Sequence, residues 1–207
     1  MKNEIVEYLD EIIPNPRCEL NYNKDYELLI ATMLSAQTTD KRVNSVTDIL
    51  FKKYPTLEEL RDAPLNDIKK IIRPIGTYNK KASNIKSIAN DLIIHGGMSN
   101  DRKFLESLSG VGRKTANVVL SNIYHEQFIA VDTHVNRVSK RLNLADEDDN
   151  VLEVEEKLTK LFPKKNLSKI HHQLVFFGRY KCKSQKPECT NCKLKDICKY
   201  YSAHCKL

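Results

Sequence analysis

Apolar residues recur every three or four positions along most of the chain, which is the spacing of one face of an α-helix. The pattern is clearest in six segments: 4–13, 25–37, 43–54, 82–93, 151–162 and 168–180. Proline and glycine fall between them and separate one predicted helix from the next. Only Gln127–Val131 is strand-like, and no alternating pattern recurs. The sequence therefore predicts an all-α fold with short loops.

Two stretches share a weak internal similarity. Residues 68–85 and 104–119 each consist of a helix, a glycine turn and a second helix that opens with basic residues. We interpret them as two helix-turn-helix hairpins, because two copies are not evidence of a solenoid repeat.

Length and composition are those of an ordinary globular protein. The 207 residues are 41% hydrophobic and 29% charged, enough for one sizeable domain or two small ones with a shared core. No apolar run approaches the length that crosses a bilayer, and residues 1–16 have no signal-peptide pattern. We expect no membrane partner and a cytoplasmic location.

The net charge of +7 is unevenly spread. From Lys164 to Leu207 there are eleven Lys or Arg but two acids, Glu188 and Asp196, whereas Ala145–Asn150 is an acidic loop. A basic segment of this density suits a polyanion such as nucleic acid, since phosphate contacts release counterions. A solvated basic face is the alternative, and charge alone does not choose between them.

Residues Gly110, Val111 and Gly112 form a turn directly before a predicted helix. Glycine allows a close backbone approach, and the helix start adds free N–H groups and a positive dipole end. Such a turn can bind a phosphodiester without reading bases, and Val111 would anchor it to the core. An ordinary helix C-cap followed by a new helix is the alternative.

Lys114 follows in the first turn of that helix. The positive helix end and partial desolvation disfavour a charged amine, and neutral amine is what Schiff-base chemistry requires. A surface lysine on phosphate is the alternative. Asp132 opens a later helix and is either an N-cap or, if it lies near Lys114, a base or a stabiliser of positive charge.

Four cysteines follow the spacing C-x6-C-x2-C-x5-C: Cys182, Cys189, Cys192 and Cys198. Four thiolates within seventeen residues suit a tetrahedral metal ion or an iron–sulfur cluster, and disulfides are disfavoured without a secretory signal. On this chemistry alone, zinc ranks ahead of iron. We predict that Cys18 and Cys205 are free thiols.

Together these motifs resemble the helix-hairpin-helix DNA glycosylase superfamily, and specifically the endonuclease III family. The resemblance rests on "LSGVGRKTANVVL", "AVDTH" and the cysteine spacing, and extends from about Leu20 to Cys198. It implies that Lys114 is the nucleophile, that Asp132 is the second catalytic residue, and that the four cysteines hold one 4Fe–4S cluster. Adenine-specific relatives lack the hairpin lysine.

The resemblance also implies DNA contacts. Gln37, in "LSAQTTD", would fill the gap left by the flipped base, and the hairpin residues Gly110–Arg113 would bind the backbone, as would Lys186 in the basic cysteine loop. The family commonly has a bulky apolar wedge where this chain has Thr77, a poor wedge. Either Tyr78 or Gln37 would then compensate.

The resemblance further implies two helical lobes with a helix-hairpin-helix motif and a C-terminal iron–sulfur cluster loop. We expect a helical barrel domain at 18–127, and a cluster domain of 1–17 plus 128–207. The predicted function is a monomeric, nucleoid-associated bifunctional DNA glycosylase and AP lyase. It would act on double-stranded DNA with oxidised pyrimidines or abasic sites.

Two other functions stay open at this point. A monofunctional glycosylase would use Asp132 to activate water and keep Lys114 for phosphate contact. A non-catalytic helix-hairpin-helix protein would bind DNA and hold a structural zinc.

Overall fold

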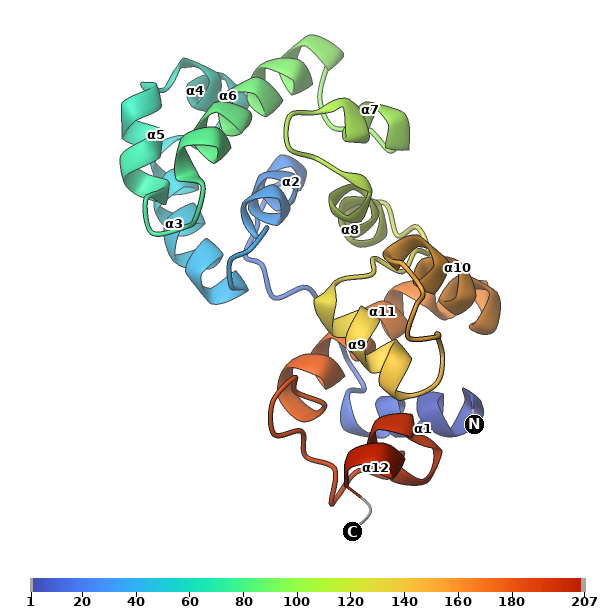
Figure 1. Ribbon diagram of the computed structural model, residues 1–207. Helices are drawn as coiled ribbons and strands as arrows, with labels where there is room; N and C mark the ends of the chain where they lie inside the picture. Colours follow the sequence, from blue (N-terminus) through green and yellow to red (C-terminus); the bar gives the residue numbers. More distant parts are fainter. Residues whose placement is uncertain (1, 206–207) are drawn as a thin grey trace. The chain divides into compact units, whose positions relative to one another are not determined.

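Regular structure in the computed structural model, which describes residues 2–205, is entirely helical (Figure 1). No residue in this range belongs to a β-strand, and the strand-like segment Gln127–Val131 is irregular. The predicted all-α fold class is confirmed.

The helices run in the following order along the chain. They are α1 (Lys2–Ile12), α2 (Asp25–Leu34), α3 (Asp40–Lys53), α4 (Leu57–Asp62), α5 (Leu65–Ile72), α6 (Tyr78–His95), α7 (Arg102–Ser107), α8 (Arg113–Ile123), α9 (Thr133–Arg141), α10 (Val151–Leu161), the 3₁₀ turn η1 (Lys164–Asn166), α11 (Leu167–Phe176), the π-helical turn η2 (Phe177–Lys181), the 3₁₀ turn η3 (Lys195–Ile197) and α12 (Lys199–His204).

Contacts divide the chain into two compact units. One unit is Glu19–Tyr124, which contains α2 to α8 and which we call the hairpin unit. The other combines Met1–Cys18 with His125–Leu207, and we call it the cysteine unit. The functional domains predicted at 18–127 and at 1–17 plus 128–207 stay a prediction.

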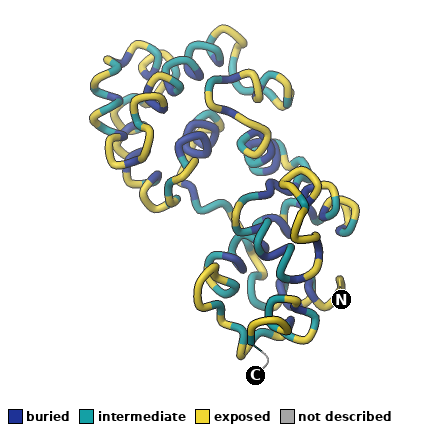
Figure 2. The backbone as a smooth tube through the Cα atoms, viewed as in Figure 1, coloured by how far each residue is buried: buried dark blue, intermediate teal, exposed yellow. Residues whose placement is uncertain are grey.

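Helix α2 is the centre of the hairpin unit. Every residue from Glu27 to Leu34 is buried, and α2 contacts α3, α6 and α8 (Figure 2). A helix that is apolar on all sides needs neighbours all round to remove it from water. The surrounding helices are accordingly amphipathic, and α5, for example, buries Ile68 and Ile72.

The cysteine unit has a core of its own. Apolar residues from α1, α9, α10 and α11 form it: Ile5, Leu9, Val135, Val138, Val154, Leu158, Ile170, Leu174 and Phe177 are among its members. Gly178 allows α9 to pack closely here, since a Cβ at this position would lie 2.9 Å from the His134 Cβ.

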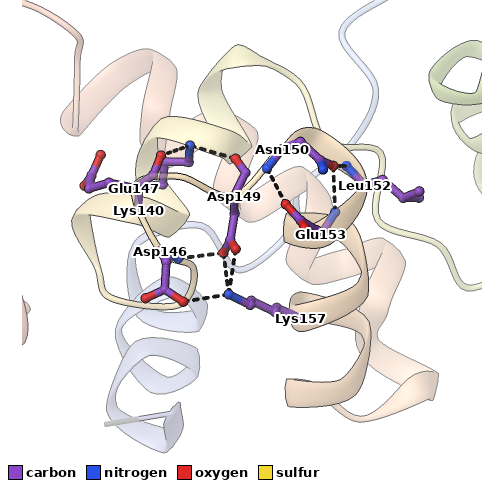
Figure 3. Close-up of polar contacts among 8 residues, drawn as sticks. All are labelled: Lys140, Asp146, Glu147, Asp149, Asn150, Leu152, Glu153 and Lys157. Carbon is purple, nitrogen blue, oxygen red and sulfur yellow. Dashed lines mark hydrogen bonds and ion pairs between the residues drawn. The ribbon is translucent and has the colours of Figure 1, made fainter.

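Local signals explain where several helices begin. Thr39 accepts a hydrogen bond from the Arg42 N–H at the start of α3, and Thr56 forms a capping box with Glu59 at the start of α4. The acidic loop before α10 is held similarly, because Lys157 Nζ lies 2.7 Å from Asp146 Oδ2 and 2.6 Å from Asp149 Oδ2 (Figure 3).

Some helix limits differ from the predicted ones. Helix α2 ends at Leu34, three residues before the predicted Gln37, because Ser35 caps it and the chain then turns. The predicted helix 168–180 contains a change to π-helical geometry at Phe177. The short helices α4 and α12 had no predicted counterpart, since six residues carry too little periodicity to detect.

Candidate active site and DNA interface

The turn between α7 and α8 requires a glycine at one position. Gly110 has a φ of +77°, in the left-handed region that favours glycine, and a Cβ there would collide with the side-chain amide of Asn84. Val111 is 5% exposed, and its N–H donates to the Leu108 carbonyl at 3.0 Å. The turn is therefore rigid and anchored in the core, as predicted for Val111.

Gly112 differs from Gly110. Its φ is −104°, which any residue can adopt, and a Cβ there would meet no atom within 4 Å. It is exposed and caps α8 without a side chain that could accept the first N–H groups of the helix. The fold itself therefore does not require glycine at position 112.

Lys114 is exposed in the first turn of α8, next to the exposed Arg113, and this turn contains no acidic residue. The sequence predicted that Lys114 is partly removed from water, but the surrounding protein leaves its side chain exposed. An exposed amine at a helix start is accessible to a ligand that binds there. Its role as a nucleophile stays a prediction.

Asp132 is the N-cap of α9. Its Oδ1 accepts hydrogen bonds from the backbone N–H groups of His134 and Val135, both at 2.8 Å. Two such bonds fix the orientation of the carboxylate, so the structural role considered from the sequence is real. It does not exclude a catalytic role, because the half-buried carboxylate is held rigidly, as a catalytic group must be.

Lys114 belongs to the hairpin unit and Asp132 to the cysteine unit. The proximity of the two side chains in one cavity stays a prediction.

Gln37 and Thr77 share an uncommon backbone conformation. Gln37 has a φ of +59° and Thr77 one of +54°, and Lys186 at +49° has it too. Few residues other than glycine adopt this region, and a β-branched threonine does so least readily. Such conformations concentrate at functional sites, where surrounding contacts maintain them. All three are exposed residues predicted to contact DNA.

The first hairpin resembles the second at its helix start. Thr77 precedes α6 but gives no side-chain cap to it, since the hydroxyl donates instead to the Gly76 carbonyl at 2.7 Å. The first turn of α6 contains no acidic residue either. Both hairpins thus leave a helix start free of side-chain acceptors.

The four predicted ligand cysteines line one small cavity, of about 20 Å³, in the cysteine unit. Apolar walls come from Leu142, Phe177 and Tyr201. No group of three or more His, Cys, Asp or Glu side chains within residues 2–205 is arranged around a single point as the ligands of one metal ion. The four thiols and the cavity they share nevertheless fit the donor set of an iron–sulfur cluster.

Hydrogen-bond donors point at these sulfurs. Arg141 Nη1 lies 3.4 Å from Cys182 Sγ, and the Tyr201 N–H lies 3.5 Å from Cys198 Sγ. The Leu194 N–H also donates to Cys192. Donors of this kind stabilise the negative charge of bound thiolates and tune clusters held by them.

Burial disfavours the ionised form of three of these thiols. It raises the pKa of Cys192 and of Cys198, and it raises that of Cys189 to about 11, with a hydrogen bond to Cys205 as the next cause. A bound metal would have to displace these protons. Cys205, predicted to be a free thiol, thus lies against one of the four cysteines.

Two lysines of the basic cysteine loop form ion pairs within the protein. Lys183 pairs with Glu188 at 2.9 Å and Lys193 with Glu11 at 2.6 Å. Their charges are partly compensated within the protein. Lys186 is exposed at the tip and is the lysine of this loop best placed for phosphate.

Histidines 171 and 172 lie on α11. His171 is 5% exposed, and burial lowers the pKa of His172. His171 is therefore a core residue, and neither histidine belongs to a group within residues 2–205 that could hold a metal ion.

Sequence reasoning missed Lys81, Asn84 and Arg141. Lys81 is buried on α6 and Asn84 packs against Gly110, whereas Arg141 donates to Cys182. The one available signal was a lysine at the buried position before Ala82 and Ile85, on the apolar face of a predicted helix.

Comparison with known proteins defines the class. Residues 30–164 match the HhH-GPD superfamily base excision DNA repair protein family. A solved structure of a thermostable thymine-DNA glycosylase is similar over 98% of this chain and 95% of its own, with a TM-score of 0.84 and 26% identity.

More similar relatives narrow the class. Endonuclease III of Bacillus subtilis is 46% identical over 92% of this chain and 88% of its own length. Endonuclease III of Escherichia coli K12 is 43% identical over 95% of this chain and 94% of its own length. A solved structure of a trapped endonuclease III–DNA covalent intermediate has a TM-score of 0.94 and 46% identity, covering 100% of this chain and 99% of that one.

The chain therefore belongs to the endonuclease III family. It is accordingly a base excision repair enzyme, a DNA glycosylase with AP lyase activity. No helix within residues 2–205 is long and apolar enough to cross a membrane.

Proposed function

We propose that this enzyme removes oxidised pyrimidines from double-stranded DNA and cuts the abasic strand through a Schiff base on Lys114. The observation that carries the proposal is the exposed Lys114 in the first turn of α8, directly after a rigid turn and an uncapped helix start. The similar endonuclease III that was trapped covalently on DNA supports a nucleophile of this type.

The chemistry follows from an amine at this position. Neutral Lys114 Nζ attacks C1′, the C1′–N bond breaks, and the damaged base leaves with the bond's electron pair. The attached amine then loses a proton, and the C1′–O4′ bond of the sugar opens with protonation of O4′ to give the protonated Schiff base. This Schiff base acidifies the 2′ hydrogen, and loss of that proton expels the 3′ phosphate as the C3′–O bond breaks in a β-elimination. The flipped nucleotide itself would exclude water from Lys114 and so favour its neutral form.

Asp132 would assist this reaction from the start of α9. Its carboxylate stabilises the positive charge that develops on the sugar and accepts a proton during deprotonation. The two N–H groups on Oδ1 hold it in one orientation.

The DNA contacts of the proposal are those predicted from the resemblance. Gly110, Val111, Gly112 and Arg113 would bind the backbone near the lesion, with Lys186 contacting phosphate farther along. Gln37 would fill the space that the flipped base leaves, and Thr77 would contact DNA at the wedge position, where its small side chain fills little of that space. Their left-handed backbones support this, because turns of this shape present side chains away from the core.

The cysteine cavity would hold one 4Fe–4S cluster through Cys182, Cys189, Cys192 and Cys198. The cluster would fix the shape of the loop that carries Lys186 and takes no part in the chemical steps. Iron found by elemental analysis, together with visible absorbance, would support this assignment, whereas zinc alone would contradict it.

We also propose that the enzyme is a monomer that works on the chromosome in the cytoplasm. Its barrel domain would be 18–127, and its cluster domain 1–17 with 128–207.

The test uses duplexes that each contain one defined oxidised pyrimidine or one abasic site. We expect base release and strand cutting without added base or amine, and loss of both in Lys114→Gln. The matched control is Lys52→Gln, an exposed lysine in the last turn of α3 with the same charge change. Base release without strand cutting would favour the monofunctional glycosylase instead.

A further inference from the structure

Lys81 is one of the few charged residues of the hairpin unit that the fold buries. It lies in the first turns of α6 and is 5% exposed. Burial alone lowers its pKa. A lysine removed from water costs free energy unless strong partners compensate it. Its partners therefore indicate what it does.

Those partners are two backbone carbonyls at the end of α2. Lys81 Nζ donates to the Leu34 carbonyl at 2.9 Å and to the Ala36 carbonyl at 2.8 Å. The Leu34 bond is an ordinary contact with the C-terminus of a helix. The Ala36 bond is not, because Ala36 lies beyond the end of α2, directly before Gln37.

The Ala36 carbonyl belongs to the peptide unit that contains the Gln37 nitrogen. The φ angle of Gln37 is measured against that peptide unit, so a contact that fixes the carbonyl also restricts φ. Gln37 has a φ of +59°, which a residue other than glycine maintains only when its surroundings impose it. Lys81 supplies such a constraint from 45 residues away in the sequence.

The same face of α6 also contacts the second hairpin. Asn84, three residues after Lys81, packs against Gly110, and Ser87, three residues further on, lies 2.9 Å from Ser109 by their hydroxyls. One helix face thus contacts both the Gln37 turn and the second hairpin.

We propose that Lys81 is a positioning residue, whose ammonium clamps the Ala36–Gln37 peptide and holds Gln37 in the conformation that enters the DNA duplex. It does not touch DNA and takes no part in bond breaking. The inference rests on the proposed role of Gln37.

The chain contains a matched control on the same helix. Lys86 Nζ also donates to two backbone carbonyls, those of Arg61 and Ala63, and so links α6 to the C-terminal end of α4. Lys86→Met therefore removes a comparable clamp that does not reach Gln37. Thermal unfolding of Lys81→Met and Lys86→Met shows how much each clamp contributes to stability alone.

The test is a double-mutant cycle of Lys81→Met with Gln37→Ala, using affinity for a duplex that contains a stable abasic-site analogue. Each single variant should bind about tenfold more weakly, and the double variant no more weakly than either single one. For the control pair, the fold-loss of affinity in the double variant of Lys86→Met and Gln37→Ala should equal the product of the two single fold-losses. If Lys81→Met does not fold, Lys81→Gln replaces it in the same cycle.

Two results would overturn the inference in distinguishable ways. If Gln37→Ala loses affinity while Lys81→Met binds as the unmodified protein does, or if their losses multiply, Lys81 does not position Gln37. If Gln37→Ala binds unchanged, the proposed role of Gln37 fails and takes the inference with it. Neither result affects the assignment of Lys114, which strand cutting tests separately.

Discussion

Gly110 and Gly112 stand two residues apart, yet the protein needs only the first of them. Gly110 has a positive φ and faces Asn84, whereas Gly112 has an ordinary φ and open space where a Cβ would be. The fold therefore explains the glycine at position 110 but not the one at position 112.

Alanine substitution should separate these two roles. Gly110→Ala should destabilise the protein by about 1–3 kcal/mol, through backbone strain and the collision with Asn84. Gly112→Ala should leave the unfolding temperature unchanged and weaken duplex binding. Unfolding and binding curves of both variants measure this, and a destabilised but fully binding Gly112→Ala would contradict it.

Single residues also show which features of the site can be predicted from the sequence and which cannot. The Gly-Val-Gly turn and buried Val111 were predictable, because glycine and apolar residues act locally. The contacts of Lys81 and Asn84 were not, since each joins segments at least 26 residues apart, and no local pattern encodes such pairings.

The element that best illustrates local electrostatics is the acidic loop before α10. Lys157 forms ion pairs with both Asp146 and Asp149 (Figure 3). Lys140 donates hydrogen bonds to the Glu147 and Asp149 carbonyls of the same loop. Hydrogen bonds to the two carboxylates raise the pKa of Lys157 to about 12, and Lys157 lowers the pKa of Asp149.

Lys157→Met should therefore destabilise the protein in a pH-dependent way. The lowered Asp149 pKa means that its contribution is complete above the unfolded value of about 3.9 and is lost as pH falls through the folded value. The pKa of Lys157 is raised, so its own contribution to stability is complete below the unfolded value of about 10.5 and is lost only at higher pH.

Unfolding temperatures measured at neutral pH and near pH 3 give the test. The difference between Lys157→Met and the unmodified protein should be present at neutral pH and shrink in acid. Lys160→Met is the matched control on the same helix, since Lys160 is 80% exposed and lies 3.9 Å from Glu156. An equal effect of both variants, or no acid dependence, would contradict the account.

Helices differed in how well the sequence predicted them. Long amphipathic ones such as α3 and α10 were found within a few residues, because their periodicity is strong. The change from α11 to the π-helical turn η2 had no local signal. It depends on the packing of Gly178 against α9, which is a tertiary contact.

At the scale of the whole molecule, the two units have different sources of stability. The hairpin unit is built around the buried helix α2, whereas residues 182–198 of the cysteine unit hold little regular structure between their four cysteines. Metal binding should therefore stabilise the second region much more than the first.

Hydrogen exchange on the iron-loaded and iron-free protein tests this difference. Iron removal should expose the amides of residues 182–205 to exchange while those of α2 keep their protection. Equal loss of protection in α2 would show that the metal supports the whole fold, and unchanged exchange at 182–205 would show that the cysteines hold no metal of structural importance.

The proposal that one enzyme both removes the base and cuts the strand depends on Lys114. The resemblance to the endonuclease III family assigned this residue as the nucleophile, because its place after the glycine turn alone favoured a phosphate contact. Its proposed encounter with Asp132 would involve two units and could not come from local patterns. Family membership supports the reaction class, and the chemistry of one amine remains to be measured directly.

That measurement is borohydride reduction during reaction with a duplex that contains an abasic site, followed by mass spectrometry of the adduct. The account predicts a covalent protein–DNA product attached at Lys114, absent in Lys114→Gln and retained in Lys52→Gln. A trapped product of equal yield in Lys114→Gln, or attachment at another residue, would contradict it.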